Sequence, residues 1–108
     1  MFAIRTVLLA AAVSGATSCT AAVESRPATH TVAMEAVGFT PASLTVKPGD
    51  SIVWVNKDPF PHTATAAGKF DSREMAPAGT WTFRATTPGE IQYVCAYHPT
   101  MKGTIVVK

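Results

Sequence analysis

The stretch VCAYHPTMKG, residues 94–103, decides how the rest of this sequence is interpreted. It places Cys95, His98 and Met101 at even spacings of three residues. Thiolate, imidazole and thioether are the side-chain groups that carry soft metal chemistry. The spacing fits a metal loop, a nucleophile beside its base, or three ordinary residues near the end of a small β domain.

The N-terminal residues are typical of a secretory signal peptide. One early cation, Arg5, precedes an apolar run from Val7 to Val13, and small residues follow. The run is shorter than the about 20 apolar residues that a membrane span needs. We therefore expect residues 1–22 to be a signal peptide that is removed on export and residues 23–29 to form a flexible tail.

Cys19 follows the apolar run and the small residues, which is the setting of a bacterial lipid-anchor acceptor. Ala16 stands where such signals usually have leucine, so loss of Cys19 with the signal peptide remains the alternative. Either way Cys95 is left alone in an oxidising compartment, where an exposed thiol tends to pair or to oxidise. We expect a periplasmic protein in which Cys95 is buried or bonded to another group.

Residues 30–108 are expected to form one domain, because the whole chain has 108 residues. Nine Lys and Arg residues, less Arg5 of the signal peptide, stand against seven Asp and Glu. This balance is too even to indicate nucleic acid or an anionic membrane as a partner. We expect a monomer that binds no nucleic acid and contacts a membrane only if Cys19 carries lipid. A bound metal would help to stabilise so small a core.

Short alternating runs separated by turn residues predict an all-β domain. In SIVWVN, residues 51–56, the side chains of Ile52, Trp54 and Asn56 share one face of a strand. The segment 67–80 is expected to be a long loop or an irregular edge. About seven or eight short strands in one small domain favour a Greek-key β-sandwich. The strands are expected at 29–37, 44–46, 51–56, 62–66, 80–86, 91–95 and 102–108.

Three histidines are candidates for a site, namely His30, His62 and His98. His30 opens the first strand beside the tail and is expected to face solvent. His62 follows DPFP, whose prolines stiffen the chain before it. In a Greek-key sandwich an early loop and a late loop can meet at the same end. We therefore expect His62 to join Cys95 and His98.

Two histidines, one cysteine and a weak axial methionine are the ligand set of an electron-transfer copper centre. The alternatives explain fewer of these residues. A Cys–His nucleophile would need a third group to orient the histidine. Zinc would need a fourth strong ligand, for which Asp58 and Asp71 are the nearest candidates. A purely structural role would make Cys95 and Met101 core residues and His98 a surface residue.

Residues 30–108 resemble the cupredoxins, the small blue copper proteins. WVNKDPFPH, residues 54–62, is similar to the segment that carries the first histidine ligand. YVCAYHPTMKGTIVV, residues 93–107, is similar to the C-terminal ligand loop and the last strand. The short gap between His98 and Met101 is closest to that of amicyanin-like bacterial cupredoxins, which also resemble plastocyanin.

The resemblance implies one type 1 copper ion with His62, Cys95 and His98 as equatorial ligands. Met101 would be a distant axial ligand. The implied function is the transfer of single electrons between periplasmic redox partners, such as a c-type cytochrome and a dehydrogenase or oxidase, without enzymatic activity. The alternative is a periplasmic copper carrier or homeostasis protein that uses the same residues.

The resemblance also assigns supporting roles around the ligands. Asn56 is expected to tie neighbouring loops together, and the backbone N–H of Thr63 to bond the sulfur of Cys95. Pro99 belongs to a rigid rim beside the ligands. Electrons would pass through an apolar partner patch that consists of Phe60, Pro61, Tyr97 and Pro99.

Overall fold

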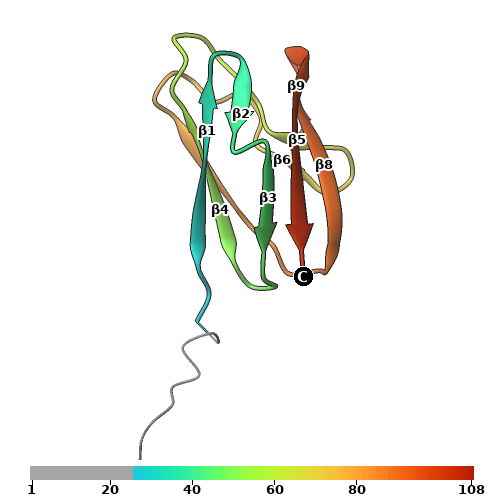
Figure 1. Ribbon diagram of the computed structural model, residues 1–108. Coiled ribbons are helices and arrows are strands. Elements are labelled where there is room, and N and C mark those ends of the chain that lie inside the picture. The colour runs from blue at the N-terminus through green and yellow to red at the C-terminus, as the bar shows by residue number, and fades with distance from the viewer. Residues whose placement is uncertain (1–25) are drawn as a thin grey trace, which may run out of the picture.

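Two packed β-sheets make up the computed structural model, which describes residues 26–108 (Figure 1). One sheet has the strand order β2-β1-β4-β7 and the other has the order β3-β9-β8-β5-β6. The strands are β1 Thr29–Glu35, β2 Gly38–Thr40, β3 Ser43–Val46, β4 Ser51–Asn56, β5 Thr65–Ala66, β6 Phe70–Asp71, β7 Thr80–Arg84, β8 Gly89–Cys95 and β9 His98–Val107. The predicted all-β sandwich is confirmed, with nine strands in the described residues instead of about seven or eight.

The proposed signal peptide and Cys19 lie outside the described residues. Within residues 26–108, the structure contains no helix of the length and apolar character that crossing a bilayer requires.

The alternating pattern of the sequence places the core as expected. In β4 the side chains of Ile52, Trp54 and Asn56 are buried, and the residues between them are half-buried. This is the period of two that a strand imposes. β4 pairs in parallel with β1 and antiparallel with β7, so it is an interior strand of its sheet.

Aromatic rings fill the space between the sheets around Trp54. Its ring centroid lies 5.4 Å from that of Tyr93 and 5.5 Å from that of Trp81. Gly103 in β9 lies against the Tyr93 ring, so close that a Cβ at this position would be 2.3 Å from it. Burying each such aromatic side chain contributes about 1.5–3 kcal/mol. These contacts hold the two sheets against each other.

The segment 67–80 differs from the expected long loop. Phe70 and Asp71 form β6, which pairs with β5, and the Phe70 ring is buried with its centroid 5.4 Å from that of Trp54. The strand predicted at 62–66 is reduced to β5, and His62 makes only an isolated bridge to Met75. Strands of two residues carry no detectable period, so a sequence pattern misses them.

The last strand begins earlier than expected, at His98. Only two residues separate it from β8, and Cys95 pairs with His98 across this turn. Asn56 ends β4 at the same end of the sandwich, remote from the point where the described chain begins (Figure 1). Segments from three parts of the sequence therefore meet at one end.

His30 was expected to face solvent, and this prediction is wrong. It is half-buried, and its Nε2 lies 2.9 Å from a carboxylate oxygen of the buried Asp50. The backbone N–H of Ala28, the ring of His30 and the backbone N–H of Lys47 together lower the pKa of Asp50 to about 2. This cluster ties the start of β1 to the β3–β4 turn, at the end of the sandwich opposite His98.

Candidate metal centre

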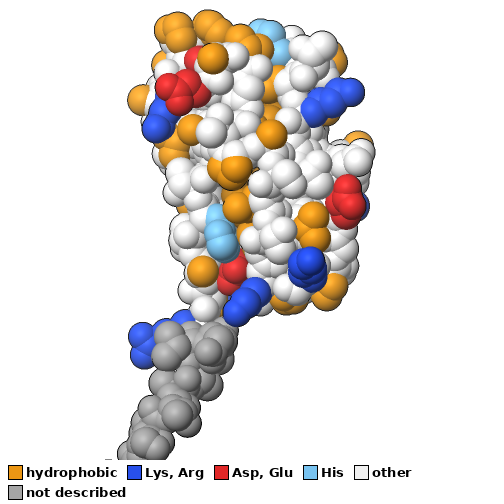
Figure 2. Space-filling view, viewed as in Figure 1, with side chains coloured by type: hydrophobic (Ala, Val, Ile, Leu, Met, Phe, Trp, Pro, Cys, Tyr) orange, Lys and Arg blue, Asp and Glu red, His pale blue; other side chains and the backbone are white. Residues whose placement is uncertain are grey.

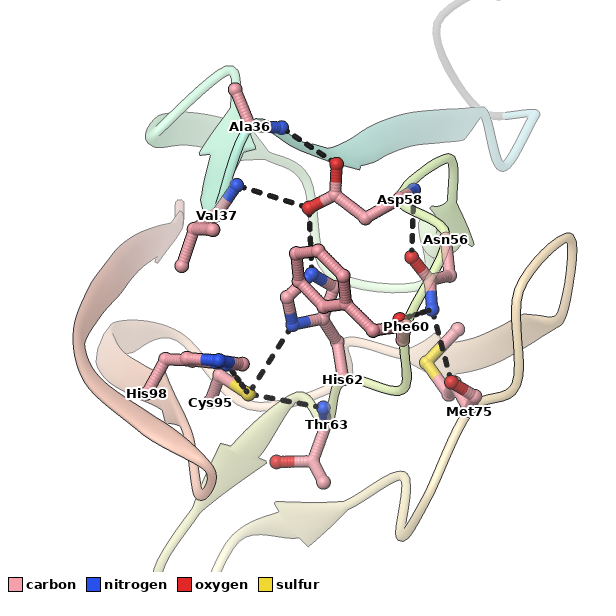
Figure 3. Close-up of polar contacts among 10 residues, drawn as sticks. All are labelled: Ala36, Val37, Asn56, Asp58, Phe60, His62, Thr63, Met75, Cys95 and His98. Carbon is pink, nitrogen blue, oxygen red and sulfur yellow. Dashed lines mark hydrogen bonds and ion pairs between the residues drawn. The ribbon is translucent and has the colours of Figure 1, made fainter.

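Three predicted ligands meet where β8 and β9 join (Figure 3). The Nδ1 atoms of His62 and His98 each lie 3.7 Å from the Sγ of Cys95. One donor atom from each of the three residues lies within 4.8 Å of the others. This is the one such group of metal-ligating side chains found in residues 26–108.

The spacing of these atoms fits a metal ion at their centre. A first-row metal such as zinc binds imidazole nitrogen at about 2.1 Å and thiolate sulfur at about 2.3 Å. With trigonal or tetrahedral angles, those bonds place nitrogen and sulfur about 3.6–3.8 Å apart. The observed separation of 3.7 Å lies within this interval. Two imidazoles and one thiolate are donors that favour copper.

The sulfur of Cys95 is shielded and receives a hydrogen bond. Its side chain is fully buried, and the backbone N–H of Thr63 donates to Sγ at 3.3 Å. The hydroxyl oxygen of Thr63 accepts a hydrogen bond from the N–H of Ala96 at 2.8 Å. Thr63 therefore holds both the sulfur and the turn that follows it. A thiolate, the form of cysteine that binds metal, can accept such a hydrogen bond.

Asp58, considered from the sequence only as a fourth ligand for zinc, contacts His62 instead, and this contact was not predicted. Its Oδ2 lies 2.7 Å from Nε2 of the fully buried His62, on the ring nitrogen that faces away from Cys95. Its carboxylate also accepts the backbone N–H groups of Ala36 at 2.8 Å and Val37 at 3.0 Å. Asp58 is outside the group of donor atoms, so its place is beside a candidate ligand, His62. An acidic residue in the short loop before a candidate histidine was the available signal.

The ionisation of Asp58 is set by these bonds. Burial alone would raise the pKa of this carboxyl, but the hydrogen bonds from Val37, His62 and Ala36 outweigh it and lower the pKa. An ionised carboxylate only accepts hydrogen bonds, so Nε2 of His62 carries the proton in their contact. In the neutral ring, Nδ1 is then left with the lone pair that a metal requires.

Asn56 holds the loop that carries Asp58 and His62. Its side-chain N–H group donates to the carbonyl oxygens of Phe60 at 2.9 Å and Met75 at 3.0 Å. Its Oδ1 accepts the backbone N–H of Asp58 at 3.0 Å. The expectation that Asn56 ties loops together matches these contacts. Because Asn56 is fully buried, its bonds are shielded from water.

The two remaining predicted residues of this region lie in β9. Met101 is 2% exposed, three residues after His98, and its axial role remains a prediction. Pro99 is exposed directly after the half-buried His98. Asp71, considered as a zinc ligand, is exposed and bonds the hydroxyl of Thr65 instead. It is not part of the group of donor atoms.

Hydrophobic side chains are exposed around this end. Phe60 is 37% exposed and Tyr97 51%, so neither is a plain core residue, and Pro61 is also exposed. The Phe60 ring centroid lies 5.8 Å from that of His98. Figure 2 shows hydrophobic side chains gathered at the top of the view, the end opposite the start of β1. Val37 is 40% exposed at this end as well. It was not predicted as part of the partner patch, because the β1–β2 turn is far from the other patch residues in the sequence.

A β-sandwich that holds two imidazoles and one thiolate at one end defines a class of small copper proteins with a single site. The chain belongs to the cupredoxin family, since the model of the cupredoxin-like domain matches residues 6–107. This family comprises copper proteins that transfer electrons, and copper, the expected cofactor, is its metal.

Individual relatives agree with this assignment. The chain is 34% identical over 87 residues to chloroplastic plastocyanin of Tetradesmus obliquus, and the match covers 68% of this chain but only 60% of that protein. It is 29% identical over 94 residues to amicyanin-alpha of Methylorubrum extorquens, covering 81% of this chain and 79% of the relative. A solved Cu(I) structure of an amicyanin variant matches with a TM-score of 0.71 and 26% identity, covering 74% of this chain and 82% of that one.

Proposed function

We propose that this protein is a type 1 copper electron carrier that shuttles single electrons between periplasmic redox partners. The supporting observation is the triangle of His62, Cys95 and His98, with both nitrogen–sulfur distances at 3.7 Å. Met101 completes the proposed set as the axial ligand. When bound, copper would supply the Cu(II)/Cu(I) couple.

The residues of the chain are arranged to keep the donor atoms in place. Asp58 holds the ring of His62, and the Thr63 N–H holds the sulfur of Cys95. These bonds do not involve the metal, so the donors have little freedom to move when its charge changes by one unit. A site that changes shape little exchanges electrons with a small barrier, because few atoms must rearrange.

The partner patch of Phe60, Pro61, Tyr97 and Pro99 is the proposed docking surface for a redox protein. His98 is half-buried beside Phe60, which gives electrons a short path to the surface. A small apolar surface suits the brief, low-area encounters that are typical of electron-transfer partners. A c-type cytochrome, a dehydrogenase or an oxidase is the proposed class of partner.

The contacts of Cys95 also raise the possibility of a nucleophilic enzyme, which the burial of its sulfur disfavours. Cys95, His62 and Asp58 have the connectivity of a nucleophile, a base and an orienting acid. Cys95 is 0% exposed and its sulfur already faces a second imidazole. A substrate would have no approach to the sulfur, which supports an electron carrier that is not an enzyme.

The alternative function is a periplasmic copper carrier with the same ligands. The half-exposure of His98 favours it, because a partner could take the metal by displacing this ring first. Transfer of electrons without transfer of copper separates the two functions. The holoprotein should reduce a c-type cytochrome and keep its metal, measured by stopped-flow absorbance and by copper analysis after the two proteins are separated.

The spectrum of the copper-loaded protein tests the leading proposal. We expect an intense blue absorption and a narrow copper hyperfine splitting in the electron paramagnetic resonance spectrum. A colourless protein with a tetragonal copper signal would contradict a type 1 centre. Export is tested separately by fractionating cells that express all 108 residues. The mature protein should appear in the periplasm, or on the membrane if Cys19 is lipidated.

A further inference from the structure

We propose that Asp58 is a positioning residue that lowers the reduction potential of the centre by acting through His62, an inference that rests on the proposed copper function. The carboxylate does not reach the metal position itself. It contacts Nε2 of His62 at 2.7 Å, whereas Nδ1 of the same ring faces Cys95 (Figure 3). Asp58 therefore acts on the centre through its hydrogen bond to the imidazole and through the field of its charge, not as a ligand.

The contact joins a full negative charge to the ring. A distance of 2.7 Å is typical of a charge-assisted hydrogen bond. A carboxylate in this position makes a metal-bound imidazole a stronger donor, as partners on the far nitrogen of a ligand histidine do in general. The oxidised centre carries one more positive charge than the reduced centre. A stronger donor and a nearby negative charge stabilise the oxidised form more, which lowers the potential.

Burial preserves the effect of this charge. Asp58 is 8% exposed and His62 is fully buried. Water and salt screen a pair in such a place much less than they screen surface charges. The electrostatic influence of Asp58 on the centre is therefore larger than that of the exposed charged residues at the same end, such as Lys57 and Glu74.

The β1–β2 turn fixes the carboxylate in place. The N–H groups of Ala36 and Val37 both point at Asp58, and both residues have positive φ, at 51° and 55°. Two such residues in succession aim adjacent N–H groups at one anion. Asp58 is thus held from one side by this turn and contacts His62 on the other. It cannot swing out to solvent without losing all three bonds.

Asp50 offers a matched control at the opposite end of the sandwich. It is also a buried aspartate that accepts two backbone N–H groups, from Ala28 and Lys47, and contacts one histidine Nε2, that of His30. Asp50→Asn and Asp58→Asn remove the same charge and disturb the same kinds of hydrogen bond. Only Asp58 contacts a proposed copper ligand.

The test compares the midpoint potentials of the copper-loaded wild type, Asp58→Asn and Asp50→Asn in spectroelectrochemical titrations. We expect Asp58→Asn to raise the potential, with about 59 mV for each tenfold change in the ratio of Cu(II) to Cu(I) affinity. Asp50→Asn should leave it close to the wild-type value. A blue Asp58→Asn protein with an unchanged potential, or equal shifts in both variants, would overturn the proposal.

A second measurement covers an Asp58→Asn protein that holds copper poorly. Its Cu(II) and Cu(I) affinities are measured separately by competition with chelators, and the Cu(II) affinity should fall more. Equal losses of both affinities would mean a merely structural role and would overturn the inference. The wild-type protein separates a failure of the proposed function from a failure of the proposed role of Asp58. A blue, reversible wild type upholds the proposed function whatever Asp58 does, and a wild type without the blue band rejects that function directly.

Discussion

Cys95 and His98 face each other across a turn of two residues, where they pair in the register of β8 and β9 and their Sγ and Nδ1 atoms lie 3.7 Å apart. The three-residue spacing from Cys95 to His98 therefore belongs to a tight hairpin and not to an open loop. The backbone pairing places the two side chains before any metal contributes. Their positions follow from strand pairing, whereas that of His62 depends on its contacts with distant residues.

Replacement of Cys95 by serine should abolish the blue absorption. The variant loses the thiolate, and serine is close to cysteine in size, so the buried site is kept in shape. Visible spectra of the copper-loaded variant and circular dichroism of the fold measure the two effects. Retention of the blue band by a folded Cys95→Ser protein would exclude the proposed sulfur ligand.

Replacement of Met101 by glutamine should retain copper and change the midpoint potential. Axial ligands of type 1 centres tune the potential, and an amide oxygen is a harder donor than a thioether. Met101 is 2% exposed, so a loss of stability is expected as well, and the potential is compared at a temperature where both proteins are folded. An unchanged potential would refute the axial role of Met101.

Asp50 should make the stability of the metal-free protein depend on pH. Its pKa falls from an ordinary value of 3.8 to about 2 in the folded state, so its ionised form is stabilised by folding. That contribution is present above about pH 4 and is lost as the pH falls through about 2. Urea unfolding of wild type and Asp50→Asn across this range measures it. The difference between the two should be largest near neutral pH, and a difference independent of pH would contradict the account.

Gly103→Ala should destabilise the fold by about 1–3 kcal/mol, the usual cost of overpacking a core. A Cβ there would come within 2.3 Å of the ring of Tyr93, which is buried, so the ring or the strand must shift. Gly38→Ala is the matched control, since its Cβ would meet only a carbonyl oxygen at 3.6 Å. Urea unfolding of both variants gives the comparison. Equal free energies of unfolding for the two variants would show that Gly103 has no special packing role.

Val37→Ser should slow electron exchange with a protein partner and leave the potential unchanged. Val37 is 40% exposed at the end of the sandwich where Phe60 and Tyr97 are exposed. The bond from Val37 to Asp58 uses the backbone N–H, which serine keeps, and a β-branched residue is the least suited to the positive φ of 55° at this position, so serine should not weaken the turn. Stopped-flow rates with a c-type cytochrome are compared with rates for ferricyanide, which needs no docking surface. Equal slowing with both reagents would contradict a docking role.

The strands with a clear alternation could be predicted because burial on one face leaves a period of two, as in β4 and β8. The two-residue strands β5 and β6 could not, because so short a segment carries no period. The candidate ligands could be named from their chemistry and spacing, and their role as ligands remains a prediction. Copper followed from that donor chemistry and agrees with the family.

By itself the sequence determined the sheet class, the donor types and the three-residue spacing from Cys95 to His98, because each of these is a local property of neighbouring residues. Only the tertiary structure decided what surrounds them. Asp58 lies beside His62, and a turn 21 residues earlier holds its carboxylate. Thr63 donates to a sulfur 32 residues away, a contact that the family resemblance implied and that no local pattern of residues predicts. Such contacts depend on how the sheets pack, since chain distance does not reveal which buried polar groups satisfy one another.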